Sequence, residues 1–262
     1  MMETPLIDRH ALVTGAGSGI GRAIALLLAK AGARVTLAGR RAEPLAAVAA
    51  ELSPARVCVA HGFDVTSAAA IAKGLEASRA ALGAIDILVN NAGEAQSAPF
   101  EKTDLELWSH LIATDLTSVY LVTQAVLPDL KARGVGARIV NIASTAGLVG
   151  YRYVSAYCAA KHGVVGLTRA LAAELAKSGI TVNAVCPGFT ETPLVLRAAA
   201  TIAAKTGKTA EAAKGELAAT NPMGRLVTPE EVADAVLWLA SPGASAINGQ
   251  AIVVAGGEVM VG

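Results

Sequence analysis

The chain has 262 residues, of which 53% are hydrophobic, and carries 22 basic against 21 acidic side chains for a formal net charge of +1. This near-neutral balance gives no reason to expect nucleic acid or an anionic membrane surface as the main partner. The length suits one α/β domain with a large buried core, and no linker or internal repeat interrupts residues 1–262, so we expect a single domain.

Cysteine usage and apolar patterning favour a cytoplasmic protein. Cys58, Cys158 and Cys186 lie far apart without metal-ligand spacing, so we expect reduced thiols and no bound metal. The opening residues MMETPLIDRH lack a basic start and an apolar run, and no signal peptide is expected. Lys, Arg or Gly interrupt the apolar stretches before the roughly 18 residues that a membrane-spanning helix needs, so no span is expected.

Seven short runs rich in Val and Ile are predicted to be strands. Most are apolar on both faces, which is typical of parallel strands covered by helices on both sides. They lie at 10–14, 34–38, 56–60, 86–90, 138–143, 180–185 and 250–254. Helical patterns follow at about 19–31, 42–52, 67–81, 104–131, 154–177 and 229–240. This alternation predicts a doubly wound α/β fold of the Rossmann type.

One segment, at about 189–227, interrupts the alternation. It contains two short helical patterns, LVLRAAATIAAK and AEAAKGELAAT, around a TGKT turn. An insertion between a strand and the next long helix is a common place for a lid or binding loop. We therefore expect this segment to cover a substrate site.

Residues 14–21, TGAGSGIG, place four glycines between the first predicted strand and the first predicted helix. A strand, a glycine-rich turn and a helix form the phosphate cradle of dinucleotide-binding folds, with the pyrophosphate on free N–H groups of the helix. The spacing is G-x-x-x-G-x-G, through Gly15, Gly19 and Gly21, with Ser18 and Ile20 between them. We expect these five residues to bind a dinucleotide; the alternative is a tight turn without a ligand.

The end of the second predicted strand, LAGRR, bears on which dinucleotide is bound. An acidic residue there binds the ribose 2′-hydroxyl of NAD, whereas arginine accommodates the 2′-phosphate of NADP. Gly39 occupies that place, and Arg40 and Arg41 follow with guanidinium groups that can bond a phosphate bidentately. NADP is favoured, and NAD stays open as the alternative. The competing interpretation is that both arginines only solvate a helix start.

Three residues in the segments RIVNIAS and SAYCAAKHG indicate acid–base chemistry. Tyr157 and Lys161 are four residues apart, hence on one helix face, and Ser144 follows a predicted strand at the edge where α/β sheets bind ligands. A tyrosine with a pKa near 10 exchanges protons poorly at neutral pH, but a neighbouring ammonium favours the phenolate. We expect Tyr157 to exchange a proton with a substrate oxygen, Ser144 to hold that oxygen, and Lys161 to tune Tyr157 and bind the cofactor ribose.

Together these motifs resemble the short-chain dehydrogenase/reductase family over almost the whole chain. The segments DILVNNAG, FDVT and NAVCPGFTET match further motifs of that family. The resemblance implies hydride transfer between a nicotinamide and a ketone or secondary alcohol, a seven-stranded parallel sheet of order 3-2-1-4-5-6-7, and a homotetramer. It also implies cofactor contacts from Asp64, Val65, Asn91, Ala92, Gly93, Pro187, Gly188, Thr190 and Thr192.

The chain departs from the family at one catalytic position. The family has an asparagine in the helix after its Asn-Asn-Ala-Gly motif, which helps to hold a water that links the lysine to a proton relay. The matching text ATDLTSVYLVTQA places Asp115 there. Aspartate accepts the same hydrogen bonds, but it donates only when protonated and adds charge near Lys161. We expect Asp115 to support the relay with an altered pH profile; the alternative is a backbone bond at a helix irregularity.

The substrate is indicated only in outline. The regions around Ser144 and Tyr157 and the C-terminal GQAIVVAGG look most like the 3-oxoacyl-thioester and polyketide ketoreductase branch of the family. We expect Thr145, Tyr151 and Tyr153 to line the substrate site with Ser144 and Tyr157. The alternatives are a carbonyl reductase or secondary-alcohol dehydrogenase acting on free aromatic or cyclic compounds, and a nucleotide-sensing protein without catalysis.

Several basic side chains could meet phosphates of coenzyme A or of an acyl carrier. They are Arg152, Arg197, Lys205, Lys208 and Lys214. The alternative is that they only solvate helix faces, as exposed lysines and arginines usually do.

Overall fold

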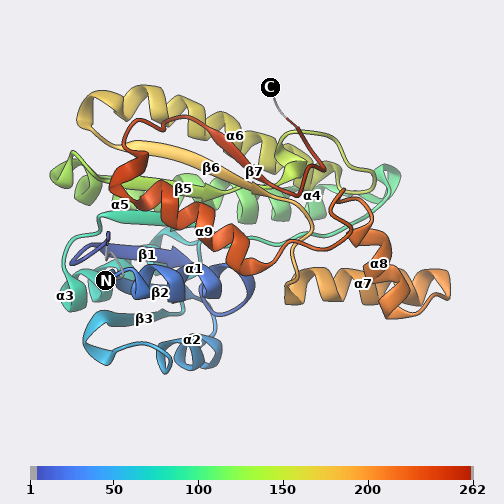
Figure 1. Cartoon of the computed structure of the whole chain (residues 1–262), viewed down its shortest axis with the longest axis horizontal. Helices are drawn as coiled ribbons and strands as arrows, with labels where there is room; N and C mark the ends of the chain where they lie inside the picture. The colour runs from blue at the N-terminus through green and yellow to red at the C-terminus, as the bar shows by residue number, and fades with distance from the viewer. Residues whose placement is uncertain (1–4, 261–262) are drawn as a thin grey trace.

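The structure is a computed structural model and describes residues 5–260. One sheet of seven parallel strands has the order β3-β2-β1-β4-β5-β6-β7 (Figure 1). This result confirms the predicted fold class and strand order. The strands are β1 His10–Thr14, β2 Arg34–Gly39, β3 Val57–His61, β4 Ile87–Asn90, β5 Arg138–Ile142, β6 Thr181–Pro187 and β7 Ala251–Val254.

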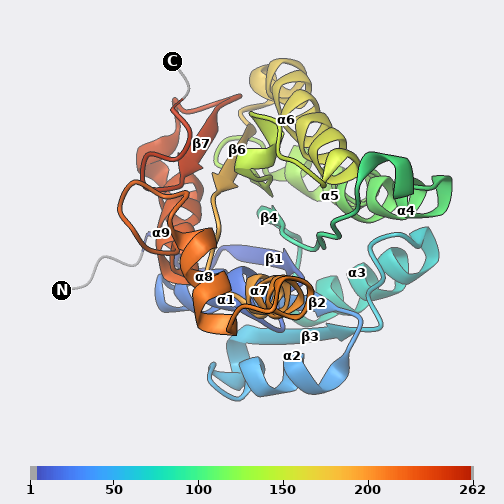
Figure 2. The same ribbon diagram turned by 90° about the vertical axis from the view of Figure 1, so that its right-hand side faces the viewer.

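Helices cover both faces of the sheet (Figures 1 and 2). Because strand side chains alternate between the faces, neighbouring residues enter different cores: Val13 packs in the core with α1 and α9, and Leu12 in the core with α3 and α5. The first layer contains α1 (Gly19–Lys30), α2 (Ala42–Ala49) and α9 (Pro229–Ala240), and the second contains α3 (Ala68–Leu82), α5 (Ser118–Arg133) and α6 (Ser155–Leu175).

The helix predicted over 104–131 is not a regular α-helix. Helix α4 (Leu105–Ile112) runs into a π-helical turn, Ala113–Thr117, and continues as α5. A π-helical turn is rare, inserts an extra residue into the helix, and occurs often at functional sites. Asp115 lies in this turn and is fully buried.

The continuous helical segment Leu105–Arg133 is long and apolar enough, by length and composition alone, to cross a membrane. This differs from the expectation that Lys, Arg or Gly would interrupt every such stretch. Part of the segment forms the protein core, since Val122, Val126 and Leu130 are buried against the sheet. The segment therefore resembles a core helix of an α/β domain.

The two ends of the segment 189–227 lie side by side and are hydrogen-bonded to each other. Thr190 forms a parallel bridge with Val227, the Glu191 amide donates to the Val227 carbonyl over 2.8 Å, and the Val227 amide donates to the Phe189 carbonyl over 2.9 Å. Helices α7 (Pro193–Thr206) and α8 (Ala210–Ala218) lie between these points and pack on each other beyond the right-hand end of the sheet in Figure 1.

Candidate active site

The glycine loop joins the end of β1 to α1. Gly15 and Gly19 have φ angles of +66° and +54°, which side chains other than glycine rarely adopt. A Cβ on Gly21 would overlap the Gly15 carbonyl and the Asn91 side chain, so the loop and the β4 end are too close for any side chain there. Ser18 is the N-cap of α1 and its side chain makes no capping bond. The first amides of α1 are thus available to an anion.

The segment after β4 is fastened to the glycine loop. The Thr14 hydroxyl accepts hydrogen bonds from the Asn91 and Ala92 amides, both over 3.0 Å, and Asn91 Nδ2 donates to the Thr14 carbonyl over 2.9 Å. Gly93 follows, and a Cβ on it would lie 2.5 Å from a carboxylate oxygen of Asp115. The structure therefore brings the predicted Asn91-Ala92-Gly93 floor against both the glycine loop and the acid–base residues.

Arg40 and Arg41 are exposed directly after β2. The Ala16 amide of the glycine loop donates to the Ala38 carbonyl of β2 over 3.3 Å, so this strand end adjoins the loop. Asp64 lies after β3, where hydrogen bonds from the Thr66 amide and hydroxyl, and then the charge of Arg40, lower its pKa. Val65 is partly buried in the core behind it.

Ser144 and Tyr157 lie together beyond the end of β5. Ser144 begins the short 3₁₀ turn Thr145–Gly147, and its hydroxyl accepts from the Ala146 amide over 3.1 Å. Tyr157 is in the first turn of α6, and the nearby Ser144 side chain acts to lower the pKa of its phenol. These two hydroxyls could hold one substrate oxygen between them.

Lys161 is one turn further along α6 and is buried. Its Nζ atom donates to the Ile142 carbonyl over 3.1 Å, lies 3.3 Å from Oδ1 of Asp115, and lies 5.5 Å from the Tyr157 ring centroid. The Glu94 amide also donates to Oδ1 of Asp115, over 3.2 Å. Within residues 5–260, Oδ2 of Asp115 is buried and has no hydrogen-bond partner.

The pKa values of these three groups depend on burial and on each other. Burial raises the pKa of Tyr157, and the Asp115 carboxylate adds to this effect, so together they outweigh the Lys161 ammonium. Lys161 acts in the expected direction and lowers the pKa of Tyr157, but burial of the phenol is the larger effect, so the net pKa lies above its ordinary value. Burial alone would lower the pKa of Lys161. The charges of Asp115 and Tyr157 oppose burial and together outweigh it, so the net pKa is raised. Burial also raises the pKa of Asp115, against the opposing charge of Lys161.

The Pro-Gly motif ends β6 at the same edge of the sheet. Gly188 follows Pro187, and the Thr190 hydroxyl donates to the Gly188 carbonyl over 3.0 Å. Thr192 is the N-cap of α7, and its side chain lies against Gly19 of the glycine loop, 3.2 Å from where a Cβ would be. The base of the α7–α8 segment thus touches the cradle predicted for the pyrophosphate.

The predicted substrate residues occupy one loop beside Ser144. The Tyr151 hydroxyl lies 2.9 Å from the Thr145 hydroxyl, and its ring meets Phe189 edge-on at 6.4 Å. Tyr153 is half-exposed and has a φ of +68°, a rare conformation for a tyrosine, while its carbonyl accepts from the Ala98 amide over 2.8 Å. The 151–153 loop and the segment after Gly93 are therefore held together.

The structure also places two acidic residues near the site, of which the sequence analysis missed Glu258. Glu258 accepts a hydrogen bond from the Tyr151 hydroxyl over 2.6 Å, and Glu94 pairs with His110 of α4. Glu258 is more than a hundred residues from Tyr151 in the chain. Only the position of β7 beside β6 brings them together, so no local motif could have indicated the contact.

The basic side chains of the α7–α8 segment are partly neutralised. Lys214 pairs with Glu191 at 2.5 Å and Lys208 pairs with Glu216. Arg152 stacks over the Tyr153 ring at 5.3 Å. The Lys205 side chain lies outside the described residues. These contacts favour the interpretation that most of these cations stabilise the surface.

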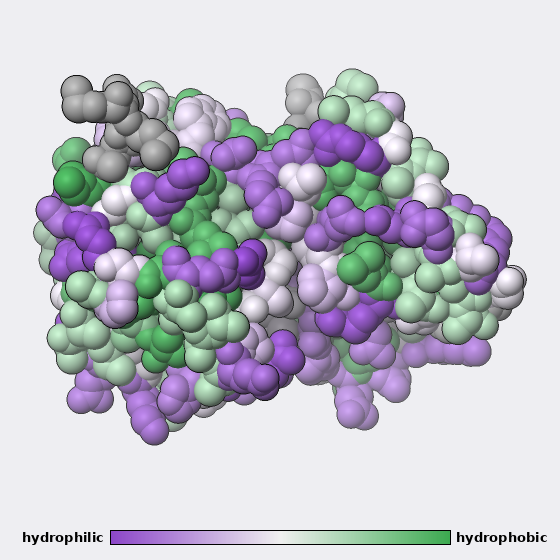
Figure 3. Space-filling view, turned by 60° about the horizontal axis from the view of Figure 1, so that its bottom comes forward, coloured by the Kyte–Doolittle hydropathy of each residue, from purple (hydrophilic) through white to green (hydrophobic). Residues whose placement is uncertain are grey.

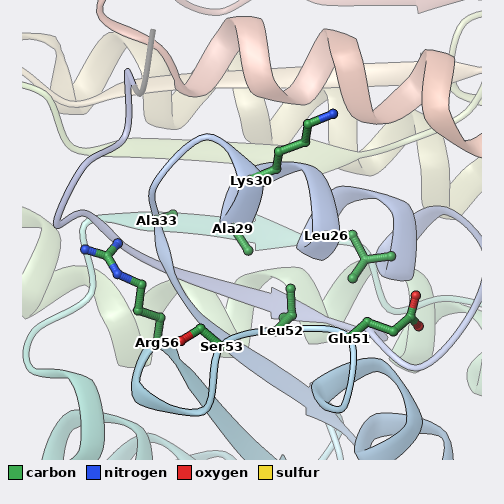
Figure 4. A pocket seen from close by; sticks show the side chains of 8 residues that line it. All are labelled: Leu26, Ala29, Lys30, Ala33, Glu51, Leu52, Ser53 and Arg56. Carbon is green, nitrogen blue, oxygen red and sulfur yellow. The ribbon is translucent and has the colours of Figure 1, made fainter. Parts of the chain in front are cut away.

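A cavity of about 320 Å³ lies away from this site, between the end of α1 and the segment before β3 (Figure 4). Two of its three charged lining residues, Arg56 and Glu51, already have partners. Arg56 donates to the Gly32 carbonyl over 2.6 Å, and Glu51 accepts from Arg22 over 2.7 Å. Nothing in the cavity points to a ligand.

The surface is indented between the sheet-bearing body and the α7–α8 lobe at the right of Figure 3. A glycine cradle, a Ser–Tyr–Lys set and a covering segment at one edge of a parallel sheet define a nucleotide-dependent oxidoreductase. Residues 9–203 match the short chain dehydrogenase family, and the chain belongs to this family.

Relatives of known description match over nearly their whole length. The chain is 44% identical to a protein of Streptomyces virginiae described as a ketoacyl reductase of the monensin polyketide synthase, over 97% of this chain and 98% of that protein. It is 41% identical to D-beta-hydroxybutyrate dehydrogenase of Cupriavidus necator, over 97% and 99%. The crystal structure of a variant of actinorhodin polyketide ketoreductase with NADPH superposes with a TM-score of 0.90, at 42% identity, over 95% of this chain and 97% of that one.

Proposed function

We propose that the protein is an NADP-dependent ketoreductase that interconverts a 3-oxoacyl thioester and its 3-hydroxy product. The observation that carries the proposal is the meeting of Ser144, Tyr157 and Lys161 at the sheet edge that also holds the glycine cradle. Its similarity to ketoacyl reductases of polyketide synthases supports the thioester as substrate.

The residues present fit a dinucleotide. Gly15, Gly19 and Gly21 leave the room that a side chain would fill, and the α1 amides can take the pyrophosphate. Arg40 and Arg41 are exposed beside the cradle, and Gly39 adds no carboxylate that would repel a 2′-phosphate. The similarity to a ketoreductase solved with NADPH also supports NADP, and NAD is the alternative cofactor.

The contributions of this chain's own residues follow from their positions. A bound nicotinamide supplies the hydride in reduction and accepts it in oxidation. Tyr157 donates its phenol proton to the carbonyl oxygen during reduction, and Ser144 holds this oxygen by a second hydrogen bond. Lys161 lies beside the ring of Tyr157 and steadies the phenolate that remains. Asp115 and the Ile142 carbonyl hold the lysine in place.

The 189–227 segment acts in this proposal as the substrate lid. Its two ends are joined at Thr190 and Val227, so α7 and α8 can move together while the sheet stays fixed. Thr145, Tyr151 and Tyr153 provide the opposite wall. The alternative substrate class is a free ketone or secondary alcohol, which the pairing of Lys208 and Lys214 favours because it removes cations from a phosphate site.

We further propose a cytoplasmic homotetramer. Apolar side chains that a globular domain would rather cover are exposed around α4 and α5: Phe100, Leu105, Trp108 and Tyr120. A second copy of the chain would bury this face. All three cysteines are free thiols, which agrees with a reducing compartment.

The first experiment is NADPH oxidation at 340 nm by the purified protein, with acetoacetyl-CoA and with free ketones. Turnover of the thioester at higher kcat/KM supports the proposal, whereas turnover of free ketones alone supports the alternative. Tyr157→Phe excludes a nucleotide-sensing protein without catalysis if it abolishes turnover and keeps NADPH binding.

A further inference from the structure

We infer that Glu258 and Tyr151 bind a hydroxyl group on the keto-bearing part of the substrate, so that among 3-oxoacyl chains and ketones the protein prefers those with a second, uncharged hydroxyl. This inference rests on the proposed function, because it specifies the substrate class of the same site.

Glu258 reaches the site from the segment after β7. Strands β6 and β7 pair in parallel, with Pro187 opposite Val254, so the four residues after Val254 lead to the edge of the sheet where Gly188 lies. A Cβ on Gly188 would come within 2.7 Å of Oε2 of Glu258. The carboxylate therefore lies directly on the Pro-Gly motif, which is next to the proposed nicotinamide site.

Tyr151 connects this carboxylate to the acid–base residues. The phenol has one proton, which it donates to Oε1 of Glu258 over 2.6 Å, so it accepts from the Thr145 hydroxyl at 2.9 Å. Thr145 is buried and follows Ser144 directly. Burial, and next the hydrogen bond to Glu258, raise the pKa of Tyr151, so the phenol keeps its proton at neutral pH.

The second carboxylate oxygen of Glu258, Oε2, has no hydrogen-bond partner among the described residues. Within residues 5–260, Oε2 of Glu258 is buried and no donor lies within hydrogen-bond distance, and no lysine or arginine of that range pairs with the carboxylate. A buried oxygen of this kind is costly unless a donor reaches it. A substrate hydroxyl supplies such a donor. A substrate carboxylate or phosphate at the same place would be repelled.

The test compares matched ketones in the NADPH assay. Cyclohexanone has no donor, 2-, 3- and 4-hydroxycyclohexanone place one at different distances, and 4-methoxycyclohexanone has similar bulk without the donor. For the parent protein we expect kcat/KM of at least one hydroxyketone to exceed that of cyclohexanone about tenfold, as one hydrogen bond to a charged group allows. The methoxy compound should show no such gain.

Glu258→Gln separates recognition from support of the loop. The glutamine keeps an oxygen that can accept from Tyr151, but it removes the charge and places an amide donor where Oε2 was. We expect the hydroxyketone advantage, which is the ratio of kcat/KM for the hydroxyketone to kcat/KM for cyclohexanone, to fall to about twofold or less. Glu76→Gln, at an exposed position on α3, is the matched control.

Charge gives a second readout. Acetoacetate is an anion and methyl acetoacetate is its uncharged ester, so Glu258→Gln should raise kcat/KM for acetoacetate relative to the ester, by about tenfold. An equal loss for all ketones in Glu258→Gln, an unchanged hydroxyketone advantage, or a parent protein that prefers acetoacetate to its ester would overturn the inference.

A thermal-shift measurement distinguishes failure of the proposed function from failure of this inference, because it does not require turnover. If no ketone or alcohol is turned over, the thermal shift produced by each cyclohexanone on the NADP-loaded protein still tests the contact. A larger shift with a hydroxyketone that disappears in Glu258→Gln supports it, and equal shifts overturn it.

Discussion

Oδ1 of Asp115 lies 3.3 Å from the ammonium of Lys161, and neither side chain is more than 6% exposed. This ion pair places a negative charge where short-chain dehydrogenases have a neutral asparagine. The charge helps to raise the pKa of both Lys161 and Tyr157. In the proposed mechanism, in which Tyr157 is the acid, the Asp115 charge would therefore keep the phenol protonated to higher pH.

Asp115→Asn should shift the alkaline limb of the pH–rate profile. Reduction needs the protonated phenol of Tyr157, so activity falls as the pH rises through the pKa of this group. Removing the carboxylate removes one cause of the raised pKa, and the fall should begin roughly one pH unit lower. The measurement is kcat/KM for ketone reduction between pH 6 and 11. Profiles that superimpose on those of the parent would contradict the role of Asp115, and Asp234→Asn, at an exposed position, is the control.

Tyr157→Phe should abolish reduction without loss of the cofactor. The substitution removes the only proton that the phenol can donate, and the loss of a general acid costs about 10²–10⁴ in rate. Single-turnover kinetics should give the drop, and titration of NADPH fluorescence should give a Kd within about threefold of the parent. A variant that retains more than about a tenth of the parent rate would show that another group supplies the proton.

Gly39→Asp should change the cofactor preference. A Cβ at this position would lie 3.5 Å from Leu45, an ordinary contact, so the new side chain fits. Its carboxylate repels a 2′-phosphate and accepts a hydrogen bond from a ribose hydroxyl. We expect kcat/KM for NADPH to fall about 100-fold and kcat/KM for NADH to stay or rise. Gly39→Ala separates bulk from charge and should change the NADPH/NADH ratio little.

Glu231, at the start of α9, should increase the free energy of unfolding by an amount that depends on pH. Hydrogen bonds from Arg225 and then from the Thr228 amide lower its pKa from 4.5 to about 2. The contribution is therefore complete above pH 4.5 and is lost as the pH falls towards 2. The side chain is 39% exposed, so we expect Glu231→Gln to cost only about 1 kcal/mol at pH 7.

Denaturant unfolding at pH 7 and pH 3 measures this difference. The gap between the parent and Glu231→Gln should narrow at the lower pH. A gap that is the same at both values would show that the glutamate acts by packing and not by its charge.

The strands and the nucleotide motifs were predictable because they are local, whereas the strand order was implied only by the resemblance to the family. β1 and β5 are apolar on both sides, the glycines of residues 15–21 sit at a fixed spacing, and Thr228 and Glu231 form the capping box that starts α9. Such features depend on neighbours within a few residues, which the sequence displays directly.

The remaining features depend on packing between distant segments. The π-helical turn brings the buried carboxylate of Asp115 beside Lys161 of α6, and the pKa of Tyr157 is raised mainly by burial of its own phenol and then by Asp115. The contact between Tyr151 and Glu258 depends on β7 lying beside β6. The periodicity and spacing of residues along the chain do not determine these distances.

The bridge between Thr190 and Val227 has a consequence for how this fold diversifies. The residues between these two positions enter and leave the domain side by side, so their length and composition can change without shifting the register of any strand. The segment can thus be replaced as a unit, because the positions of its two ends are fixed by the Thr190–Val227 bridge. Exchanging it between homologues would alter the compounds admitted while the acid–base residues and the nucleotide cradle keep their places.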